Sequence, residues 1–198
     1  MTQLTTHKVY AQLKTTDFDA YEKPGKNKGA RGQLIELALG IPNSSKLTDL
    51  VDGELKTFTV GESIAVTQLK HCLEEIIDGS VEFEDSKVGE KLAQTLYVGF
   101  TRNNEYVNTA LVNEEIDPVH YTQLAEDYGY ISAQIKAAYM NGTELNTITG
   151  PNKLLQIRTK ASKNRQGNYT PLCYNEVQLK DKGMAFYLLA SFGKEVVK

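Results

Sequence analysis

Long apolar runs, tryptophan and closely spaced cysteines are absent from this chain of 198 residues. No run approaches the ~18 apolar residues that a membrane-spanning helix needs, so we expect no contact with a membrane. The segment MTQLTTHKVY has no basic stretch followed by an apolar core, so we expect no secretion signal. The two cysteines, Cys72 and Cys173, match no metal-ligand spacing, which favours a reduced, cytoplasmic protein. The three histidines are scattered, which argues against histidine-based chemistry.

Charge is unevenly distributed along the chain. The net charge is −3, whereas dedicated nucleic-acid-binding proteins are often basic. Two segments nevertheless concentrate lysine and arginine without any acidic residue: KPGKNKGAR (23–31) and KLLQIRTKASKNR (153–165). The acidic residues gather in 74–90 and 114–117. The basic segments are either two solvated loops or one local surface that binds a polyanion.

Strand-like and helix-like segments alternate, which is typical of a mixed α/β protein. We expect a single domain, 1–198, with a central mixed sheet flanked by helices. Strands are expected at 54–60, 95–100, 105–112 and the start of 153–162, and a possible strand followed by a helix at 62–79. Helical patterns occupy part of 1–22, then 32–40, and 117–140, where Pro118 lies near the first turn. The closing segment, 183–197, is either a strand or a helix.

The stretch DGELKTFTV (52–60) places Glu54 and Lys56 two residues apart in a predicted strand. Residues at that spacing project from the same face, so a carboxylate and an ammonium lie side by side. An exposed ion pair of this kind is common and contributes only about 0–1 kcal/mol. The alternative is half of a phosphodiester-cleaving site. There a metal neutralises the phosphoryl oxygens and supplies a nucleophile, and a positioned ammonium stabilises charge.

Carboxylates upstream of Glu54 are candidates to complete such a site, because Mg²⁺ usually takes one or two carboxylates together with water and substrate phosphate. Either Asp49 or Asp52 is available. We favour Asp49, because Gly53 leaves little room for a turn between Asp52 and Glu54. Glu36 sits among apolar neighbours in LIELAL, and a buried glutamate needs a partner; alternatively it lies on the solvent edge of an amphipathic helix.

Four segments, in this order along the chain, resemble the MutH family, the methyl-directed mismatch-repair endonuclease and the related GATC-cutting restriction enzymes. They are KGARGQLIE (28–36), DLVDGELKT (49–57), VGEKLAQTLY (88–97), and LLQIRTKAS (154–162) continuing to AFYLLASF (185–192). The piece LQIR-x-KA is the most distinctive. The resemblance implies a PD-(D/E)xK restriction-endonuclease-like fold in two lobes around a DNA cleft. The catalytic lobe would occupy roughly 20–110 and the DNA-recognition lobe roughly 111–198.

The resemblance also implies an activity and a set of site residues. The activity is Mg²⁺-dependent cleavage of double-stranded DNA 5′ to the G of GATC, with Mn²⁺ as an expected substitute. The implied metal ligands are Asp49, Glu54 and the backbone carbonyl of Leu55. The implied catalytic residues also include the lysine Lys56, the helix glutamate Glu36, and Lys28 and Lys91 near the scissile phosphate. The implied DNA contacts are Arg158, Lys160 and Tyr187, and the basic residues Lys163 and Arg165 that follow.

Departures from the family pattern leave the exact target open. Thr159 stands where the mismatch-repair protein has a proline, and Asp49 is two residues closer to Glu54 than in the family. Lys160 is a sensible reader of guanine, although a sequence-blind phosphate contact is the alternative.

Several functions fit this set of residues. The residue content, with 11 tyrosines and no tryptophan, favours a restriction-type enzyme, a homodimer on DNA if both strands are cut. The alternative within the same chemistry is a repair nickase that acts with a partner protein. The second hypothesis is a non-catalytic DNA-binding module on the same fold. The third is a structural or protein-interaction domain whose charges form a solubilising surface.

Overall fold

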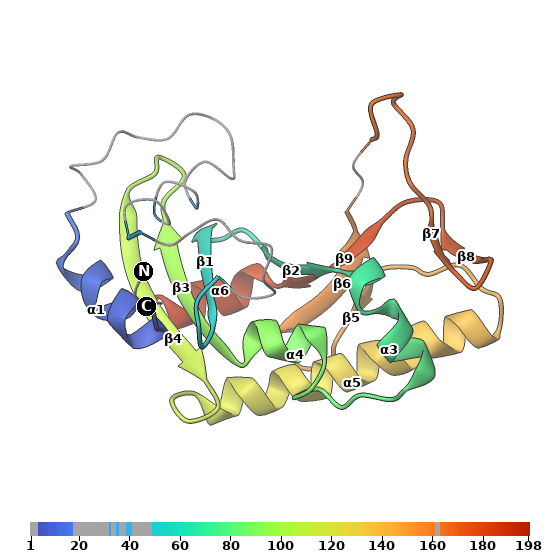
Figure 1. The fold of residues 1–198 in the computed structure, drawn as a ribbon, viewed down its shortest axis with the longest axis horizontal. Helices are drawn as coiled ribbons and strands as arrows, with labels where there is room; N and C mark the ends of the chain where they lie inside the picture. The colour runs from blue at the N-terminus through green and yellow to red at the C-terminus, as the bar shows by residue number, and fades with distance from the viewer. Residues whose placement is uncertain (1–3, 18–31, 33–34, 36–38, 41–48, 161–162) are drawn as a thin grey trace. The chain divides into compact units, whose positions relative to one another are not determined.

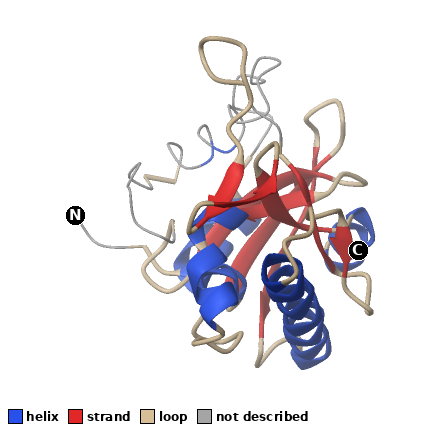
Figure 2. Ribbon diagram, turned by 90° about the vertical axis from the view of Figure 1, so that its right-hand side faces the viewer, coloured by secondary structure: helices blue, strands red, loops and turns tan. Residues whose placement is uncertain are grey.

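A computed structural model describes residues 4–17, 32, 35, 39–40, 49–160 and 163–198. The chain forms two compact units that alternate along the sequence. Unit 1 comprises Met1–Ile64, Lys91–Pro118 and Ala190–Lys198, and unit 2 comprises Ala65–Glu90 and Val119–Leu189. Each unit contains both helices and strands; Figure 2 shows the helices and strands of the chain. The mixed α/β class predicted from the sequence is therefore confirmed.

Unit 1 contains a three-stranded sheet whose middle strand is parallel to one neighbour and antiparallel to the other (Figure 1). The sheet order is β1 (Glu54–Thr59), β3 (Gln94–Phe100) and β4 (Tyr106–Asn113), and the helices are α1 (Thr6–Thr15) and α6 (Ala190–Val196). β1 is parallel to β3, with Glu54 opposite Thr95, and β4 is antiparallel to β3. The parallel pairing brings the first residues of β1 and β3 together at one end of the sheet.

Side chains of β1 alternate between two buried layers. Leu55 is 4 % exposed and packs in an apolar cluster to which α1 also contributes. Phe58 packs edge-on against Tyr97, whose ring in turn meets Phe192 of α6, with centroids 6.4 and 5.2 Å apart. Because successive strand residues face opposite ways, Glu54 and Lys56 share the face of Phe58, and the aromatic cluster supports that face.

Unit 2 contains a four-stranded sheet and a separate hairpin. The sheet order is β2 (Ile64–Gln68), β9 (Met184–Leu188), β6 (Leu155–Thr159) and β5 (Ile148–Thr149), and the hairpin is β7 (Leu172–Tyr174) and β8 (Val177–Lys180). The helices are η2 (Leu69–His71), α3 (Leu73–Asp78), α4 (Lys87–Leu92), whose last two residues belong to unit 1, and α5 (Pro118–Met140). β6 is antiparallel to both β5 and β9.

The long helix α5 buries a continuous stripe of side chains. Its buried apolar residues are Tyr121, Leu124, Tyr128, Ile131 and Ile135, whose spacing of three and four places them on one helix face. The Tyr128 ring lies 6.0 Å from the ring of Phe186 in β9. Tyr121 and Tyr128 are thus part of the core.

A buried carboxylate on the same helix anchors the turn that leads into β6. Asp127 is 0 % exposed, and its carboxylate accepts the backbone N–H groups of Asn152, Leu154 and Leu155 at 2.7, 2.9 and 2.8 Å. Gly150 lies so close that an added Cβ would sit 2.1 Å from Asp127 Cγ. The start of β6, the strand that carries Arg158, is therefore held to α5 by one side chain.

We expect Asp127→Asn to destabilise the protein strongly. An amide has one acceptor oxygen, and its NH₂ group would face N–H donors. A buried donor left without a partner costs about 1–3 kcal/mol, and each kcal/mol lowers Tm by roughly 2–4 °C in a chain of this size. Thermal melts of Asp127→Asn beside Asp85→Asn, which changes an exposed carboxylate, measure the effect. Equal melting temperatures for the two variants would contradict this role.

Most of the elements expected from the sequence are present. The strands at 54–60, 95–100 and 105–112, the helix at 117–140 and the strand at the start of 153–162 are confirmed by β1, β3, β4, α5 and β6. The segment 62–79 forms β2, η2 and α3, and the closing segment forms a strand and then a helix, β9 and α6. The helix expected at 32–40 lies largely outside the described residues. Among those that are described, no helix is both long and apolar enough to cross a membrane.

Candidate active site

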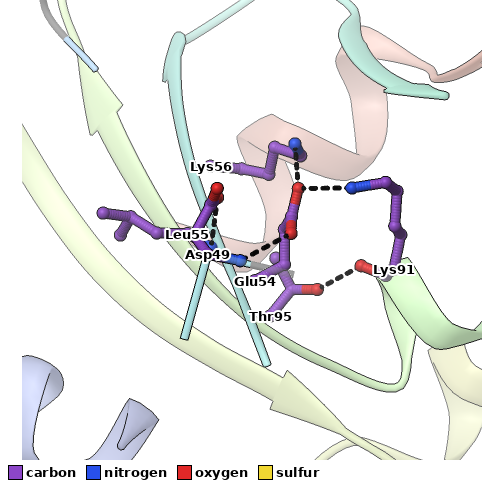
Figure 3. A network of polar contacts seen from close by, with 6 residues as sticks. All are labelled: Asp49, Glu54, Leu55, Lys56, Lys91 and Thr95. Carbon is purple, nitrogen blue, oxygen red and sulfur yellow. Dashed lines mark hydrogen bonds and ion pairs between the residues drawn. The ribbon is translucent and has the colours of Figure 1, made fainter. Parts of the chain in front are cut away.

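A buried carboxylate at the start of β1 gathers two ammonium groups. Glu54 is 1 % exposed, and its Oε1 pairs with Nζ of Lys56 and, at 3.1 Å, with Nζ of Lys91 (Figure 3). Removing a carboxylate from water is costly unless charged partners surround it. An exposed ion pair, the ordinary interpretation of Glu-x-Lys, does not describe this arrangement.

Asp49 is tied to the same end of β1 by backbone hydrogen bonds. Its N–H donates to Glu54 Oε2 and its Oδ2 accepts the N–H of Leu55, both at 3.3 Å (Figure 3). The turn between them is closed by the N–H of Leu50, which donates to the carbonyl of Gly53 at 2.9 Å. Two carboxylates and two ammonium groups therefore converge at one point, although 42 residue positions separate Asp49 from Lys91.

The electrostatics of this cluster oppose ionisation of Asp49. Burial raises the pKa of Asp49 above its ordinary value, and the negative charge of Glu54 raises it further. The ammonium groups of Lys56 and Lys91 and the N–H of Leu55 only partly offset these effects. The ionised form of Asp49 is thus disfavoured in the folded protein, and a cation beside both carboxylates would favour it.

Asp49→Asn is expected to raise Tm at neutral pH. Because the pKa of Asp49 is raised on folding, the folded protein holds the proton more tightly than the unfolded chain, and stability is lost as pH rises through the folded-state pKa. Asparagine is neutral at every pH and keeps an oxygen that can accept the Leu55 N–H. In thermal melts at several pH values, the Tm of Asp49→Asn should exceed that of the wild type at neutral pH. The difference should shrink as pH falls toward 3.8, the ordinary pKa of aspartate. No gain at neutral pH, with Asp85→Asn as the reference, would contradict the interpretation.

Asp52, the other candidate ligand, is engaged elsewhere. Its carboxylate accepts the N–H of Thr6 at 2.7 Å and the Thr6 hydroxyl at 3.2 Å, at the first residue of α1. Gln94 Nε2 donates to the backbone carbonyl of Asp52 at 2.9 Å and to Thr6 Oγ1 at 2.7 Å. Asp52 therefore fastens the turn to α1 and β3. These contacts support Asp49 as the metal ligand, an assignment that stays a prediction.

Lys91 reaches Glu54 because a buried threonine fixes the chain between α4 and β3. Thr95 is 0 % exposed, lies opposite Glu54 in the parallel register, and donates its hydroxyl to the carbonyl of Lys91 at 2.9 Å. Sequence reasoning missed Thr95, Gln94 and Thr6 as supports of the site. A threonine after a short helix carries no signal of its own, and the contacts of Gln94 and Thr6 join residues far apart in the chain.

The two carboxylates fit a magnesium site. Their oxygens are the hard ligands that Mg²⁺ prefers, and the pKa of Asp49 is raised first by burial and then by the negative charge of Glu54, which a cation would neutralise. In the part of the chain that the structure describes, no three histidine, cysteine or acidic residues are grouped to hold a metal by themselves. Water, substrate phosphate and the predicted Leu55 carbonyl would therefore complete the coordination, as is usual for Mg²⁺. Glu36 and Lys28 lie outside the described residues, so their predicted roles stay predictions.

The predicted DNA contacts lie in unit 2. The guanidinium carbon of Arg158 in β6 stacks 4.2 Å from the ring centroid of Tyr187 in β9. Lys160 follows β6, is exposed, and donates its backbone N–H to the carbonyl of Gly183 at 2.8 Å. Lys163 and Arg165 are exposed in the turn beyond. Arg158 and Tyr187 are thus brought together, and their contact with DNA stays a prediction.

No family model matches the chain, and no curated protein matches it. The resemblance of four sequence segments to the MutH family therefore stays a prediction.

Proposed function

We propose that the protein is a Mg²⁺-dependent, sequence-specific DNA endonuclease of the PD-(D/E)xK class, related to the MutH family. The observation that carries the proposal is the convergence of Asp49, Glu54, Lys56 and Lys91 at the start of β1. Phosphodiester hydrolysis needs charge neutralised on the phosphoryl oxygens and a nucleophile available near neutral pH. Paired carboxylates can hold the metal, and positioned ammonium groups can stabilise the negative charge. In addition, β1 is a strand of a mixed sheet, as the proposed fold requires.

Each residue of the cluster has a distinct role in the proposed reaction. Asp49, Glu54 and the carbonyl of Leu55 would hold Mg²⁺, which when bound neutralises phosphoryl oxygens and lowers the pKa of a bound water. Lys56 points at the buried Glu54 oxygen, where its ammonium orients the attacking water and stabilises negative charge in the transition state. Lys91 meets the same oxygen and is available to a non-bridging phosphate oxygen. Burial of Glu54 strengthens these interactions, because charges attract more strongly away from bulk water.

The proposed substrate is double-stranded DNA at GATC or a closely related sequence. Lys160 is the proposed reader of guanine, because lysine and arginine recognise guanine O6 and N7 in the major groove. Arg158, stacked on Tyr187, is the second proposed contact. Cutting both strands would require two protomers on one site, whereas a nickase would act as a monomer with a repair partner.

Digestion of plasmid DNA with mapped ends tests the proposed function. Plasmid that is unmethylated at GATC, incubated with Mg²⁺ or Mn²⁺, is expected to be cut 5′ to the G and to carry 5′-phosphates, and a plasmid methylated at GATC measures whether methylation blocks cleavage. Intact plasmid across a metal and salt series would contradict the proposal. Binding of the plasmid without cleavage would assign the protein to the non-catalytic DNA-binding modules instead.

A further inference from the structure

We propose that the turn at residues 163–169 of unit 2, here called the cationic turn, is a clamp on the DNA phosphate backbone that acts on any sequence, with Tyr169 as its central contact. The inference deepens the proposed function and rests on its DNA-binding part. It separates two tasks within the basic segment: the cationic turn positions the duplex, while Arg158 and Lys160 are left to read bases.

The cationic turn is an ordered structure closed by its own hydrogen bonds. Lys163 and Tyr169 face each other in an antiparallel bridge. The N–H of Asn164 donates to the carbonyl of Asn168 at 2.8 Å, and Asn164 Oδ1 accepts the N–H groups of Gln166 and Asn168 at 3.0 and 2.9 Å. Figure 1 shows the segment that leads into β7 extending away from that strand. An ordered turn loses less conformational entropy on binding than a disordered loop does.

An exposed aromatic ring lies near two ammonium groups at the base of the cationic turn. Tyr169 is 40 % exposed, and its ring centroid lies 5.5 Å from Nζ of Lys163 and 5.1 Å from Nζ of Lys182. Lys182 also pairs with Asp181, at 3.6 Å. Both lysines are within the range of cation–π attraction. The ring therefore holds two positive charges on an exposed surface.

The chemistry of this surface fits a nucleic-acid backbone better than bases or an apolar partner. The segment 158–170 contains no acidic residue, and the carboxylate that meets this surface, Asp181, is paired with Lys182. Lysines are flexible point charges that bind phosphates without demanding the planar geometry with which arginine recognises guanine. The exposed part of Tyr169 offers an apolar face for a sugar between two phosphates. Arg165, exposed between Asn164 and Gly167, adds a third charge.

The salt dependence of binding tests the clamp, because each phosphate contact contributes about 0.9 to the slope of log K against log salt. Binding of fluorescent duplexes with and without GATC is measured by anisotropy in EDTA, from about 50 to 200 mM KCl. The triple variant Lys163→Gln, Arg165→Gln, Lys182→Gln is expected to reduce the slope by roughly 2–3 on both duplexes alike. The matched control Lys70→Gln, Lys194→Gln, Lys198→Gln removes three exposed lysines elsewhere and is expected to leave the slope unchanged.

Two further variants separate the shape of the cationic turn from its charge. Asn164→Ala keeps every charge and removes the acceptor that closes the turn, so weaker binding with an unchanged slope is expected. Tyr169→Ala is expected to weaken binding several-fold, whereas Tyr169→Phe keeps the ring and should bind like the wild type. Melting curves of each variant check that the chain is folded. Wild-type affinity in both Asn164→Ala and Tyr169→Ala would overturn the inferred role of the ordered turn.

The outcomes distinguish this inference from the proposed function. An unchanged slope in the triple variant, in a wild-type protein that cuts plasmid, would overturn the clamp alone. A reduced slope in a protein that cuts no DNA would support the clamp and contradict the nuclease. If the triple variant lost affinity for the GATC duplex alone, the cationic turn would be a reader of bases, and the clamp would be overturned. Absence of salt-dependent binding by the wild type would overturn both.

Discussion

Replacing Lys56 with alanine is expected to abolish DNA cleavage while leaving DNA binding intact. The ammonium of Lys56 is directed at the buried Glu54 oxygen, where it is proposed to act on the attacking water. Loss of one preorganised electrostatic group costs roughly 10²–10³ in rate, and loss of a proton-transfer group roughly 10²–10⁴. Because Lys91 still pairs with Glu54 at 3.1 Å, the buried carboxylate keeps a partner and the fold is expected to survive.

Single-turnover cleavage and DNA affinity, measured on the same preparation, check this prediction. Lys70→Ala is the matched control, because Lys70 is an exposed lysine of η2 outside the cluster. Cleavage by Lys56→Ala at the wild-type rate would remove Lys56 from the mechanism. Loss of both binding and the cooperative melting transition would instead assign Lys56 a structural role.

Gly53→Ala is expected to damage both stability and activity. A Cβ at this position would lie 2.2 Å from the backbone oxygen of Gln94 and 2.7 Å from Thr6 Cγ2. The Gln94 oxygen belongs to β3, so the turn that joins Asp49 to Glu54 must move instead. Overpacking of this kind costs about 1–3 kcal/mol. A misplacement of about 1 Å in a reacting constellation reduces the rate by roughly 10²-fold.

Melting curves and cleavage rates of two glycine variants test this prediction. Gly129→Ala is the matched control, because Gly129 lies in α5 with no atom within 4 Å of an added Cβ. Alanine is favoured over glycine within a helix by about 1 kcal/mol, so the control is expected to melt at or above the wild-type temperature. A Gly53→Ala protein with wild-type Tm and cleavage rate would show that the turn does not hold the carboxylates in place.

The sequence predicted those features of the fold that depend on local periodicity. Alternation in TLYVGF and EYVNTALV predicted the strands β3 and β4, and the spacing of apolar residues after Pro118 predicted α5. Parallel pairing of β1 with β3 has no local signal, because it depends on how the intervening chain crosses over. The hairpin of β7 and β8 was also missed, because its strands are short. Its turn places Asn175 and Glu176 at positive φ, and glycine at these positions would have indicated a turn more clearly.

The candidate site was predicted in part, and for different reasons at each residue. The position of Glu54 and Lys56 on one face of the strand was predicted from their two-residue spacing and strand geometry. Lys91 was named only through the family resemblance. That Asp52 binds the first residue of α1 while Asp49 joins the site depends on a contact with Thr6, 46 positions away, which no spacing rule contains. The same limit applies to Asp127, whose three backbone partners lie 25 to 28 positions further on. The predicted division into lobes near residue 110 stays a prediction.

The most direct test of the central claim is cleavage of an end-labelled duplex that contains one GATC, by the wild type and by Glu54→Gln, with Mg²⁺ or EDTA. The proposed site predicts that the wild type cuts 5′ to the G only when Mg²⁺ is present and leaves a 5′-phosphate, and that Glu54→Gln leaves the duplex intact. A duplex left uncut by the wild type with Mg²⁺, or equal cutting by Glu54→Gln, would contradict the assignment of this carboxylate and lysine cluster as a nuclease centre.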